Sequence, residues 1–382
     1  MYSLPEWAKA VPSPAFVLDK QRLIRNLELI RSVRQGAGVE IILALKGFAL
    51  WHVFPLLREY LDGATASSLN EALLIREHMG LKAHTYAVAY KEESFPQIVR
   101  HSQHLSFNTL SQYHRFKDYL KGKPVSCGLR INPEQSDVTV DLYNPSSPNS
   151  RLGELQENMP EQLPEGIEGL HFHVLCESSA QSLEKVLEAV ETRFGHWLPQ
   201  VKWINMGGGH LMTRAGYDVE HLVRILKAFK EKHQLQIILE PGSAIAWQTG
   251  ELVATVLDIH QGRDLQTAIL DVSFTAHMPD TLEMPYRPKI FGAVDPAPGD
   301  TRHLYRMGGV SCLAGDFMEP YAFAQELKVG DRIVLDDMMH YTMVKTTLFN
   351  GVEHPSIYMR DEADTLQELR RFYYADYLDR LG

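Results

Sequence analysis

The strongest constraint on the fold is a regular alternation between short apolar runs and amphipathic segments through the first two thirds of the chain. The apolar runs have the length and composition of buried strands, and they cover residues 39–45, 63–66, 84–89, 104–107, 126–131, 169–174, 202–206 and 236–239. Segments between them place apolar residues three and four positions apart, as helices with one buried face do, at 68–78, 110–120, 182–194 and 219–232. Eight successive β/α units predict a TIM barrel, an α/β fold in which the carboxyl ends of the strands form one rim.

Local signals mark helix starts within this pattern. Ser68, followed three residues later by Glu71, forms a capping box, in which the serine oxygen accepts a helix N–H and the glutamate reaches back. Near the N-terminus, an apolar run at 14–18 precedes Asp19, a good N-cap for a helix that continues to Arg34. The chain therefore begins with a strand and a helix.

The sequence after Leu239 is rich in strands instead. Strands are expected at 252–259, 267–271, 305–310, 332–335 and 341–346, with no regular helices between them. This pattern predicts a β-domain, a barrel or a sandwich, which the N-terminal strand could join. A chain of 382 residues also exceeds the ~250–300 residues that one core usually supports. We therefore expect a segment at 1–35 that packs with the β-domain, a barrel at 36–245 and a C-terminal β-domain at 246–382.

Composition bounds the partners and the location. The net charge of −10 argues against nucleic acid and is compatible with a cationic ligand. No apolar run approaches the ~18 residues of a membrane span, and the start lacks the features of a signal peptide. We therefore expect a cytoplasmic protein that binds no membrane. Cys127, Cys176 and Cys312 have no CxxC spacing, which argues against a disulfide framework and a structural zinc site.

Lys46 lies at the end of the first barrel strand, directly after an apolar run. An amine delivered from a buried strand would be partly desolvated, which favours its neutral, nucleophilic form. Enzymes place Schiff-base lysines in such surroundings. A lysine that merely ends a strand and extends to solvent would have the same local sequence.

Two turns on the same rim are candidates for cofactor binding. Three glycines at 207–209 follow the seventh strand, where backbone N–H groups could approach an anion and form a phosphate cradle, with the dipole of a following helix adding to it. Such triplets also occur in mobile turns. Glu240, followed by Pro241 and Gly242, ends the eighth strand, where its carboxylate could bond a ring nitrogen or simply be exposed.

His171 and His173 end the sixth strand, and the alternation of a strand puts both on one face. This arrangement suits a metal pair, or one imidazole stacked on a flat ligand. No similarly placed set of histidines and carboxylates accompanies them, which argues against the metal. His171 could equally be structural.

The remaining candidates lie in loops. Arg151 belongs to a long stretch at 132–163, rich in Pro, Ser and Asn, that we interpret as a loop over the site. Cys312 stands in a glycine-flanked loop of the β-domain, four residues before Asp316, and could serve as an acid or be an inert buried thiol. Tyr341 could bind a ligand or be an ordinary core aromatic.

The order of these signals is more specific than any one of them. A lysine on the first barrel strand, a histidine on the sixth, Gly-Gly-Gly on the seventh and Glu-Pro-Gly on the eighth precede Cys-x-x-x-Asp and a tyrosine in a β-domain. This order resembles the alanine-racemase-fold (fold type III) pyridoxal-phosphate-dependent decarboxylases of ornithine and diaminopimelate. The segments at 43–48, 172–177, 276–280 and 311–316 resemble more closely the carboxynorspermidine/carboxyspermidine decarboxylase family, and the likeness extends from about Pro14 to Tyr377.

The resemblance implies pyridoxal 5'-phosphate as the cofactor and gives the rim residues roles. Lys46 would form the Schiff base and His173 would stack on the ring. Glu240 would keep the pyridine nitrogen protonated, so that the ring accepts the electron pair left when CO2 departs. The other cofactor contacts, mainly to the phosphate, are expected from Gly207, Gly208, Gly209, Gly242 and Tyr341.

The resemblance also implies a substrate and a partner. The substrate would be carboxynorspermidine or carboxyspermidine, an α-amino acid with an aminopropyl- or aminobutyl-amino tail, and the product would be norspermidine or spermidine. Cys312, from the other subunit of a homodimer with shared active sites, would protonate the carbanion. The expected substrate contacts are Arg151, Ser243, Asp271, Asp280 and Asp316.

Ser243 departs from the family pattern. The ornithine-type enzymes carry Arg at this position and the carboxynorspermidine branch usually carries Glu. One acidic ligand for the polyamine tail is therefore missing or replaced, which leaves the preferred tail length open. Thr65 stands where the ornithine enzymes have Asp, as the closer branch tends to have.

Three other functions stay open at this point. Diaminopimelate or another basic amino acid decarboxylase would share the chemistry but would need an arginine-rich carboxylate clamp, which is not found around Glu240. A non-catalytic pyridoxal-phosphate carrier would be a lone barrel with no use for Cys312. A metal-dependent barrel hydrolase would be built on His171 and His173 and would bind zinc.

Overall fold

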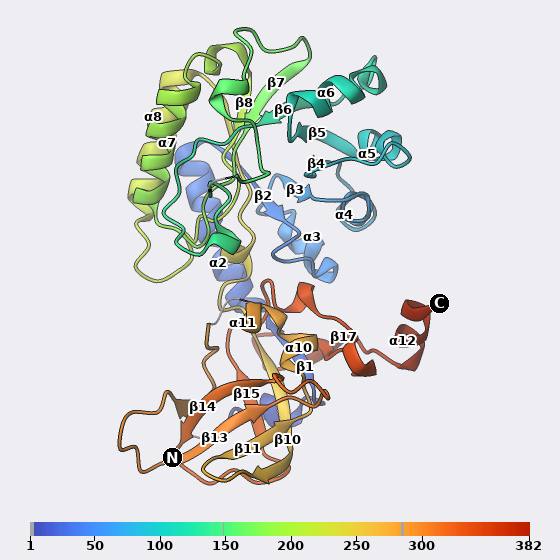
Figure 1. The fold of residues 1–382 in the computed structure, drawn as a ribbon, viewed down its shortest axis with the longest axis vertical. Coiled ribbons are helices and arrows are strands. Elements are labelled where there is room, and N and C mark those ends of the chain that lie inside the picture. The colour runs from blue at the N-terminus through green and yellow to red at the C-terminus, as the bar shows by residue number, and fades with distance from the viewer. Residues whose placement is uncertain (1–3, 148, 284–285) are drawn as a thin grey trace. The chain divides into compact units, whose positions relative to one another are not determined.

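The structure, a computed structural model, describes residues 4–147, 149–283 and 286–382. The chain divides into two compact units, one made of Asn26–Ile245 and the other of Met1–Arg25 with Ala246–Gly382 (Figure 1). Each unit has its own sheet, so the two are described in turn.

The first unit is a closed barrel of eight parallel strands, in the sequence order β2 to β9. The strands are β2 Glu40–Ala44, β3 Gly63–Ala66, β4 Ala83–Tyr86, β5 Ser102–Phe107, β6 Ser126–Arg130, β7 Ile167–His171, β8 Trp203–Asn205 and β9 Gln236–Leu239. The predicted TIM barrel is confirmed, and each of the predicted apolar runs overlaps one strand. Strand β7 ends at His171 rather than at residue 174, so His173 lies in the loop that follows.

Helices surround the barrel, with α4 to α6 on one side and α7 and α8 on the other (Figure 1). Their bounds are α2 Lys20–Ala37, α3 Phe54–Leu57, α4 Leu69–Leu74, α5 Phe95–His101, α6 Leu110–Phe116, α7 Ala180–Phe194, α8 Val219–His233 and α9 Ser243–Ala246. The predicted capping box starts α4: Ser68 Oγ accepts the Glu71 N–H at 3.2 Å, and the Glu71 carboxylate accepts the N–H of Ser67. None of the described helices combines the length and the apolar character that crossing a membrane requires.

Trp203 fills the amino end of the barrel. Its indole covers Gly128 and Gly169, where an added Cβ would lie 2.3 and 2.1 Å from the ring. The indole Nε1 donates to Ser126 Oγ at 2.8 Å, and this hydroxyl donates to Glu168 Oε2 at 2.6 Å. The interior is therefore a packed core at this end, which leaves the carboxyl rim as the place for a ligand.

The second unit contains a mixed sheet in the order β12-β14-β13-β11-β10-β1-β16-β17, with β15 also paired to β10. Its strands are β1 Ala15–Asp19, β10 Gly250–Gln261, β11 Gln266–Leu270, β12 Ala293–Val294, β13 His303–Gly308, β14 Phe317–Phe323, β15 Arg332–Leu335, β16 Ser356–Arg360 and β17 Leu366–Arg370. The N-terminal strand β1 lies between β10 and β16, and every one of its residues is buried. The prediction that this strand joins the β-domain is therefore confirmed.

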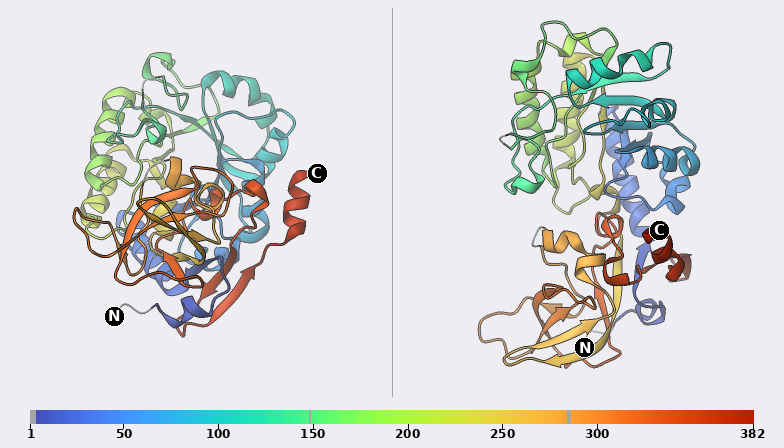
Figure 2. Two further views of the ribbon diagram at one scale, coloured as in Figure 1. Left: turned by 60° about the horizontal axis from the view of Figure 1, so that its bottom comes forward. Right: turned by 45° about the vertical axis from the view of Figure 1, so that its right-hand side comes forward.

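Two expectations for this unit are wrong. The segment at 341–346 is a turn with a 3₁₀ helix at Met343–Lys345 instead of a strand, and Tyr341 has a left-handed φ of 51° that no strand allows. Helices also occur between the expected strands, namely α10 Phe274–His277 and α11 Pro279–Glu283, while α1 Glu6–Ala10 and α12 Tyr374–Leu381 lie outside that stretch. Helix α12 follows β17 at the end of the chain (Figure 2).

The division between the units falls inside α2, between Arg25 and Asn26, whereas the sequence led us to expect it at residue 35. The later turns of this helix contact the barrel unit. The Arg34 guanidinium donates to the carbonyl of Tyr60 at 3.0 Å and pairs with Asp62 at 2.9 Å. These contacts explain why residues 26–35 belong with the barrel.

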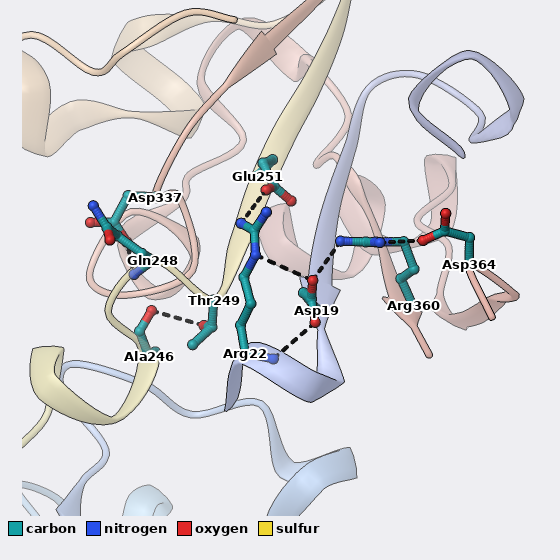
Figure 3. Close-up of polar contacts among 9 residues, drawn as sticks. All are labelled: Asp19, Arg22, Ala246, Gln248, Thr249, Glu251, Asp337, Arg360 and Asp364. Atoms are coloured by element: carbon teal, nitrogen blue, oxygen red, sulfur yellow. Dashed lines mark hydrogen bonds and ion pairs between the residues drawn. The ribbon is translucent and has the colours of Figure 1, made fainter. Parts of the chain in front are cut away.

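A network of buried and partly buried charges joins β1, β10, β16 and the start of α2 (Figure 3). Asp19 caps α2 through the N–H of Arg22 at 2.9 Å, as predicted, and also accepts Nη2 of Arg360 at 2.5 Å. The Arg22 guanidinium continues to Glu251 Oε1 at 2.6 Å. Glu251 is fully buried, and burial raises its pKa from the usual 4.5 to about 7, although Arg22 opposes the rise.

We expect Glu251→Gln to change the pH dependence of stability. Between pH 4.5 and about 7 the unfolded chain releases the Glu251 proton while the folded chain retains it, so folding becomes less favourable as the pH rises. As the pH rises through this window, the free energy of unfolding of the wild-type protein should fall relative to that of Glu251→Gln. Below pH 4.5 and above about pH 7, the difference between the two proteins should be constant. Urea unfolding of both proteins at several pH values measures it. Parallel pH profiles would contradict the buried-carboxyl assignment.

Candidate active site

The carboxyl ends of all eight barrel strands bring polar side chains to one rim, because parallel strands end at the same edge. In the order β2 to β9 these side chains are Lys46, Thr65, Tyr86, Asn108, Arg130, His171 with His173, Asn205 and Glu240. Three of them, Lys46, His173 and Glu240, were predicted as catalytic. Tyr86, Asn108, Arg130 and Asn205 were not singled out from the sequence, although each is the last residue of its strand or the next one.

Lys46 and His173 meet at this rim. Lys46 Nζ lies 3.2 Å from His173 Nε2, and His173 Nδ1 accepts the backbone N–H of Gly208 at 2.8 Å. Because Nδ1 accepts, the proton of the neutral imidazole is on Nε2. That N–H can donate to Lys46 only if the amine has a free lone pair, so the contact favours the neutral, nucleophilic lysine.

The electrostatics of the rim agree with this assignment. Desolvation lowers the pKa of Lys46, and the Arg130 guanidinium lowers it further. The pKa of His173 is also held well below its ordinary value, first by burial and then by the positive charge that Lys46 carries when it is protonated. The Lys46 side chain is nevertheless exposed to solvent. This is expected of a group at the mouth of a barrel that must meet a ligand.

Glu240 is oriented by neighbouring strands. Its Oε1 accepts Nδ2 of Asn205 at 2.6 Å, and Asn205 Oδ1 in turn accepts the N–H of Gly207 at 2.9 Å. The other oxygen lies 3.9 Å from His171 Nε2. Burial raises the pKa of Glu240, and its hydrogen bond with Asn205 opposes the rise. A buried carboxylate held in this way can bond a protonated ring nitrogen.

Arg130 is a buried cation in the middle of these residues. Its Nη2 donates to the carbonyl of His173 at 3.0 Å, and its guanidinium lies 4.6 Å above the ring of Tyr86. No carboxylate lies within 4.0 Å of the guanidinium in the ranges that the structure describes. Its charge therefore acts on its neighbours, and it disfavours protonation of both Lys46 and His173.

The predicted loop at 132–163 is anchored at this rim through Asn108. Asn108 Oδ1 accepts the Tyr86 hydroxyl at 2.7 Å and the N–H of Gly153 at 2.9 Å, while its Nδ2 donates to the carbonyl of Arg151 at 2.9 Å. Arg151 itself is exposed. The backbone at this residue is fixed, and its side chain is accessible to a ligand.

The glycine triplet has no room for side chains. An added Cβ would lie 2.6 Å from Phe172 O at Gly207, 2.3 Å from Glu240 O at Gly208 and 2.2 Å from Leu175 O at Gly209. The first two N–H groups donate to Asn205 and His173, so they organise the rim residues. The next helix, α8, begins only at Val219, so no helix dipole follows the triplet directly. Phosphate binding by this loop stays a prediction.

Gly242 faces the turn that carries Lys46. An added Cβ at Gly242 would lie 3.2 Å from the Gly47 Cα, and the Ala44 N–H donates to the carbonyl of Pro241 at 3.0 Å. The first and last strands of the barrel are thus in close backbone contact at the rim. Ser243 begins the short helix α9 directly after this contact.

The three predicted acids of the β-domain differ in their surroundings. Asp271 uses both oxygens within the domain, for the Ser13 hydroxyl at 2.7 Å and the Thr255 N–H at 2.8 Å. Asp316 is also engaged at both oxygens, by backbone N–H groups. Asp280 is 8% exposed; its Oδ2 accepts Thr342 Oγ1 at 2.9 Å and the Tyr286 hydroxyl at 3.1 Å, whereas its buried Oδ1 has no partner among the described residues.

Cys312 and Tyr341 lie in turns of the same unit. The Cys312 side chain is exposed, which excludes the inert buried thiol that the sequence also allowed. Tyr341 adopts a left-handed φ of 51° in a turn, a strained conformation for a large residue and one that often marks a functional position. Within the described ranges, no three His, Cys, Asp or Glu side chains gather as a metal site.

The closed parallel barrel, joined in one chain to a separate mixed sheet, carries a lysine, a histidine and a glutamate on its carboxyl rim. This is the arrangement expected, from the resemblance, of a two-domain pyridoxal-phosphate enzyme. The family model described as "Pyridoxal-dependent decarboxylase, C-terminal sheet domain" matches residues 16–339, and the chain belongs to this family. The protein is therefore a pyridoxal-phosphate-dependent decarboxylase, not a metal-dependent hydrolase or a non-catalytic carrier.

Relatives with known activities match the whole chain. A carboxyaminopropylagmatine decarboxylase from Synechocystis is 51% identical and covers 98% of this chain and 96% of its own length. A carboxynorspermidine/carboxyspermidine decarboxylase from Campylobacter jejuni is 44% identical, with coverage of 96% of this chain and 98% of its own. The predicted resemblance to the carboxynorspermidine/carboxyspermidine decarboxylase family is therefore confirmed.

Solved structures agree with the observed architecture. The crystal structure of carboxynorspermidine decarboxylase from Campylobacter jejuni complexed with norspermidine has a TM-score of 0.90 and 42% identity, and it covers 97% of this chain and 100% of its own. Diaminopimelate decarboxylase from Helicobacter pylori complexed with L-lysine has a TM-score of 0.80 at 17% identity, with 98% of both chains covered. The latter similarity shows the shared fold.

We expect Gly209→Ala to destabilise the barrel and to weaken cofactor binding. Both Gly209 and Gly216 have left-handed φ, of 88° and 81°, so alanine at either costs about 1–2 kcal/mol of strain. Only at Gly209 would the new Cβ meet backbone, at 2.2 Å, while Gly216 has open space. Gly209→Ala should lose roughly 1–3 kcal/mol more than the Gly216→Ala control. Urea unfolding and fluorescence titration with pyridoxal phosphate measure the two effects, and equal losses would refute the crowding argument.

Proposed function

We propose that this protein decarboxylates carboxynorspermidine and carboxyspermidine, to give norspermidine and spermidine. The observation that carries the proposal is full-length similarity to the Campylobacter jejuni enzyme, whose crystal structure contains norspermidine and has a TM-score of 0.90 against this chain. We include a cytoplasmic location in the proposal.

The rim residues fit pyridoxal phosphate. The lone pair on Lys46 that the His173 contact favours is what covalent attachment of an aldehyde requires. When bound, the cofactor supplies an electron sink for the pair that CO2 leaves behind. Lys46 would hold its aldehyde carbon, Glu240 would hold a proton on its ring nitrogen, and His173 would cover one face. Arg130 would keep Lys46 and His173 neutral by its charge.

Asp280 is our strongest candidate for a contact with the cationic tail of the substrate. The buried Oδ1 of Asp280 has no partner among the described residues, and a buried carboxylate oxygen without a donor is costly. An ammonium group of the tail would satisfy it. Thr342 and Tyr286 fix the other oxygen, so the carboxylate is already oriented. Asp271 is a weaker candidate, since both of its oxygens are engaged within its own domain. Arg151 is exposed but carries a positive charge, so it cannot bind the cationic tail.

A second substrate has specific support. The relative from Synechocystis, at 51% identity, is a carboxyaminopropylagmatine decarboxylase, and agmatine ends in a guanidinium group rather than an ammonium group. Ser243 removes the glutamate that the carboxynorspermidine branch usually carries, which changes the ligands for the tail. The two candidates share the amino acid head and differ at the tail, so a direct comparison of substrates decides between them.

We also propose a homodimer in which Cys312 of one subunit protonates the carbanion formed in the other. The exposed position of the thiol supports the proposal, because an exposed cysteine can meet a ligand held by a partner. The backbone N–H of Cys312 donates to Asn350 Oδ1 at 3.0 Å, which fixes the residue in its loop.

The purified protein should be yellow, and borohydride reduction should fix the cofactor covalently to Lys46, as peptide mass spectrometry would detect.

The decisive assay compares kcat/KM for carboxynorspermidine, carboxyspermidine, carboxyaminopropylagmatine and diaminopimelate. We expect kcat/KM for one of the three carboxylated polyamines to exceed that for diaminopimelate by at least about tenfold, since one well-placed charged contact contributes about 1.5–3 kcal/mol. Preference for diaminopimelate would refute the substrate class, and preference for the agmatine derivative would favour the second candidate.

Mixing two impaired variants tests the shared site. Lys46→Ala cannot attach the cofactor, and Cys312→Ala should retain the cofactor but protonate slowly or at the wrong position. If each site combines Lys46 of one subunit with Cys312 of the other, heterodimers of the two variants contain one intact site and should regain up to about half of the wild-type activity per dimer. Confirmed heterodimers without recovered activity would contradict sharing.

A further inference from the structure

The loop at 309–316, which carries Cys312, connects β13 to β14 and is organised by one carboxylate. Asp316 is 5% exposed; its Oδ1 accepts the N–H of Thr275 at 3.0 Å and its Oδ2 accepts the N–H of Ser311 at 3.1 Å. The N–H of Gly309 donates to the Asp316 carbonyl at 2.7 Å. Asp316 therefore closes the loop on itself and ties it to α10, the helix that contains Thr275.

Gly309 makes room for this carboxylate. An added Cβ at Gly309 would lie 2.3 Å from Asp316 Oδ2 and 2.4 Å from its Cγ, so a side chain there would displace the carboxylate. Gly315, in the same loop, has nothing within 4 Å of the same position. The need for glycine is thus specific to the position that faces Asp316.

A second side chain holds Cys312 directly. Asn350 Oδ1 accepts the Cys312 N–H at 3.0 Å from a turn in which Asn350 has a left-handed φ of 59°. This turn follows Thr347, whose N–H donates to the carbonyl of Ala276 in α10 at 2.7 Å. Both attachments of the Cys312 loop therefore lead to α10.

Helix α10 continues almost directly into α11, which carries Asp280. We propose that Asp316 and Asn350 are positioning residues that hold the Cys312 backbone in place against α10. The inference rests on the proposed function, in which Cys312 delivers the proton and Asp280 binds the cation of the substrate. It assigns Asp316 a role different from the substrate contact expected from the sequence.

The contrast between the two acids supports this assignment. Both oxygens of Asp316 already accept backbone N–H groups, so a cation would have to compete with them. Asp280 has a buried oxygen without a partner among the described residues. Asp316 should therefore act through Cys312, and Asp280 should act on the substrate.

Steady-state kinetics of Asp316→Asn and Asp280→Asn separate these roles. An asparagine at 316 presents one acceptor and one donor to two N–H groups, so one hydrogen bond is lost and the loop shifts. We expect kcat to fall roughly 10- to 100-fold with little change in KM, as misplacement of a catalytic group does. During turnover in D2O, the single deuterium should be added from either face, so that the product is a mixture of both configurations at the reacting carbon. Asp280→Asn should instead raise KM and retain deuterium on one face.

Hydrogen exchange tests the loop independently of activity. In holoenzyme, the peptide that spans 309–317 should exchange faster in Asp316→Asn and Gly309→Ala than in wild type, because their amides lose protection. Gly315→Ala is the matched control and should leave exchange unchanged. Asn350→Asp keeps an acceptor for Cys312 and should retain more activity than Asn350→Ala.

The outcomes are distinct. A raised KM with unchanged kcat in Asp316→Asn would make Asp316 a substrate ligand and overturn the inference. Unchanged exchange in both Asp316→Asn and Gly309→Ala would also overturn it. Wild-type protein that decarboxylates no carboxylated polyamine would refute the proposed function, while the exchange experiment would still decide whether Asp316 and Gly309 hold the loop.

Discussion

The hydrogen bond from the Gly208 N–H to His173 Nδ1 is the contact on which the chemistry of the barrel rim depends. It puts the imidazole proton on Nε2, toward Lys46, and so favours a lysine with a free lone pair. The neighbouring N–H of Gly207 orients Asn205, and through it Glu240. One glycine turn therefore sets the protonation and orientation of groups from three strands, and none of its glycines has room for a side chain.

Two buried groups of opposite charge tune the same rim. Arg130 makes the Lys46 amine harder to protonate, and Glu240 acts in the opposite direction. Arg130 has no carboxylate within 4.0 Å in the described ranges, so its field extends to any ligand at the rim. That field favours anionic groups such as a phosphate or an α-carboxylate.

Sequence reasoning located the barrel strands, Lys46 and Glu240 because the apolar runs are distinct and their ends coincide with one rim. It missed Arg130 and Asn205, since a single polar residue at the end of a strand has no local signal of its own. The segment at 341–346 was assigned to a strand because its composition fits one, and only the backbone shows the left-handed turn at Tyr341. The engagement of Asp316 by backbone N–H groups was also hidden, because hydrogen bonds between distant segments leave no sequence pattern.

The position of β1 has a consequence for the order in which the protein can assemble. This strand is synthesised before the barrel, yet its partners β10 and β16 both follow the complete barrel in the chain. Most barrel strands pair with their neighbours in sequence, and the contact between β2 and β9 closes the ring. All eight strands precede β10, so the barrel can close while translation continues. Until the C-terminal third emerges, the apolar strand β1 has no partners and must be kept from aggregation. Strand β1 is thus made before the barrel and can be buried only after it.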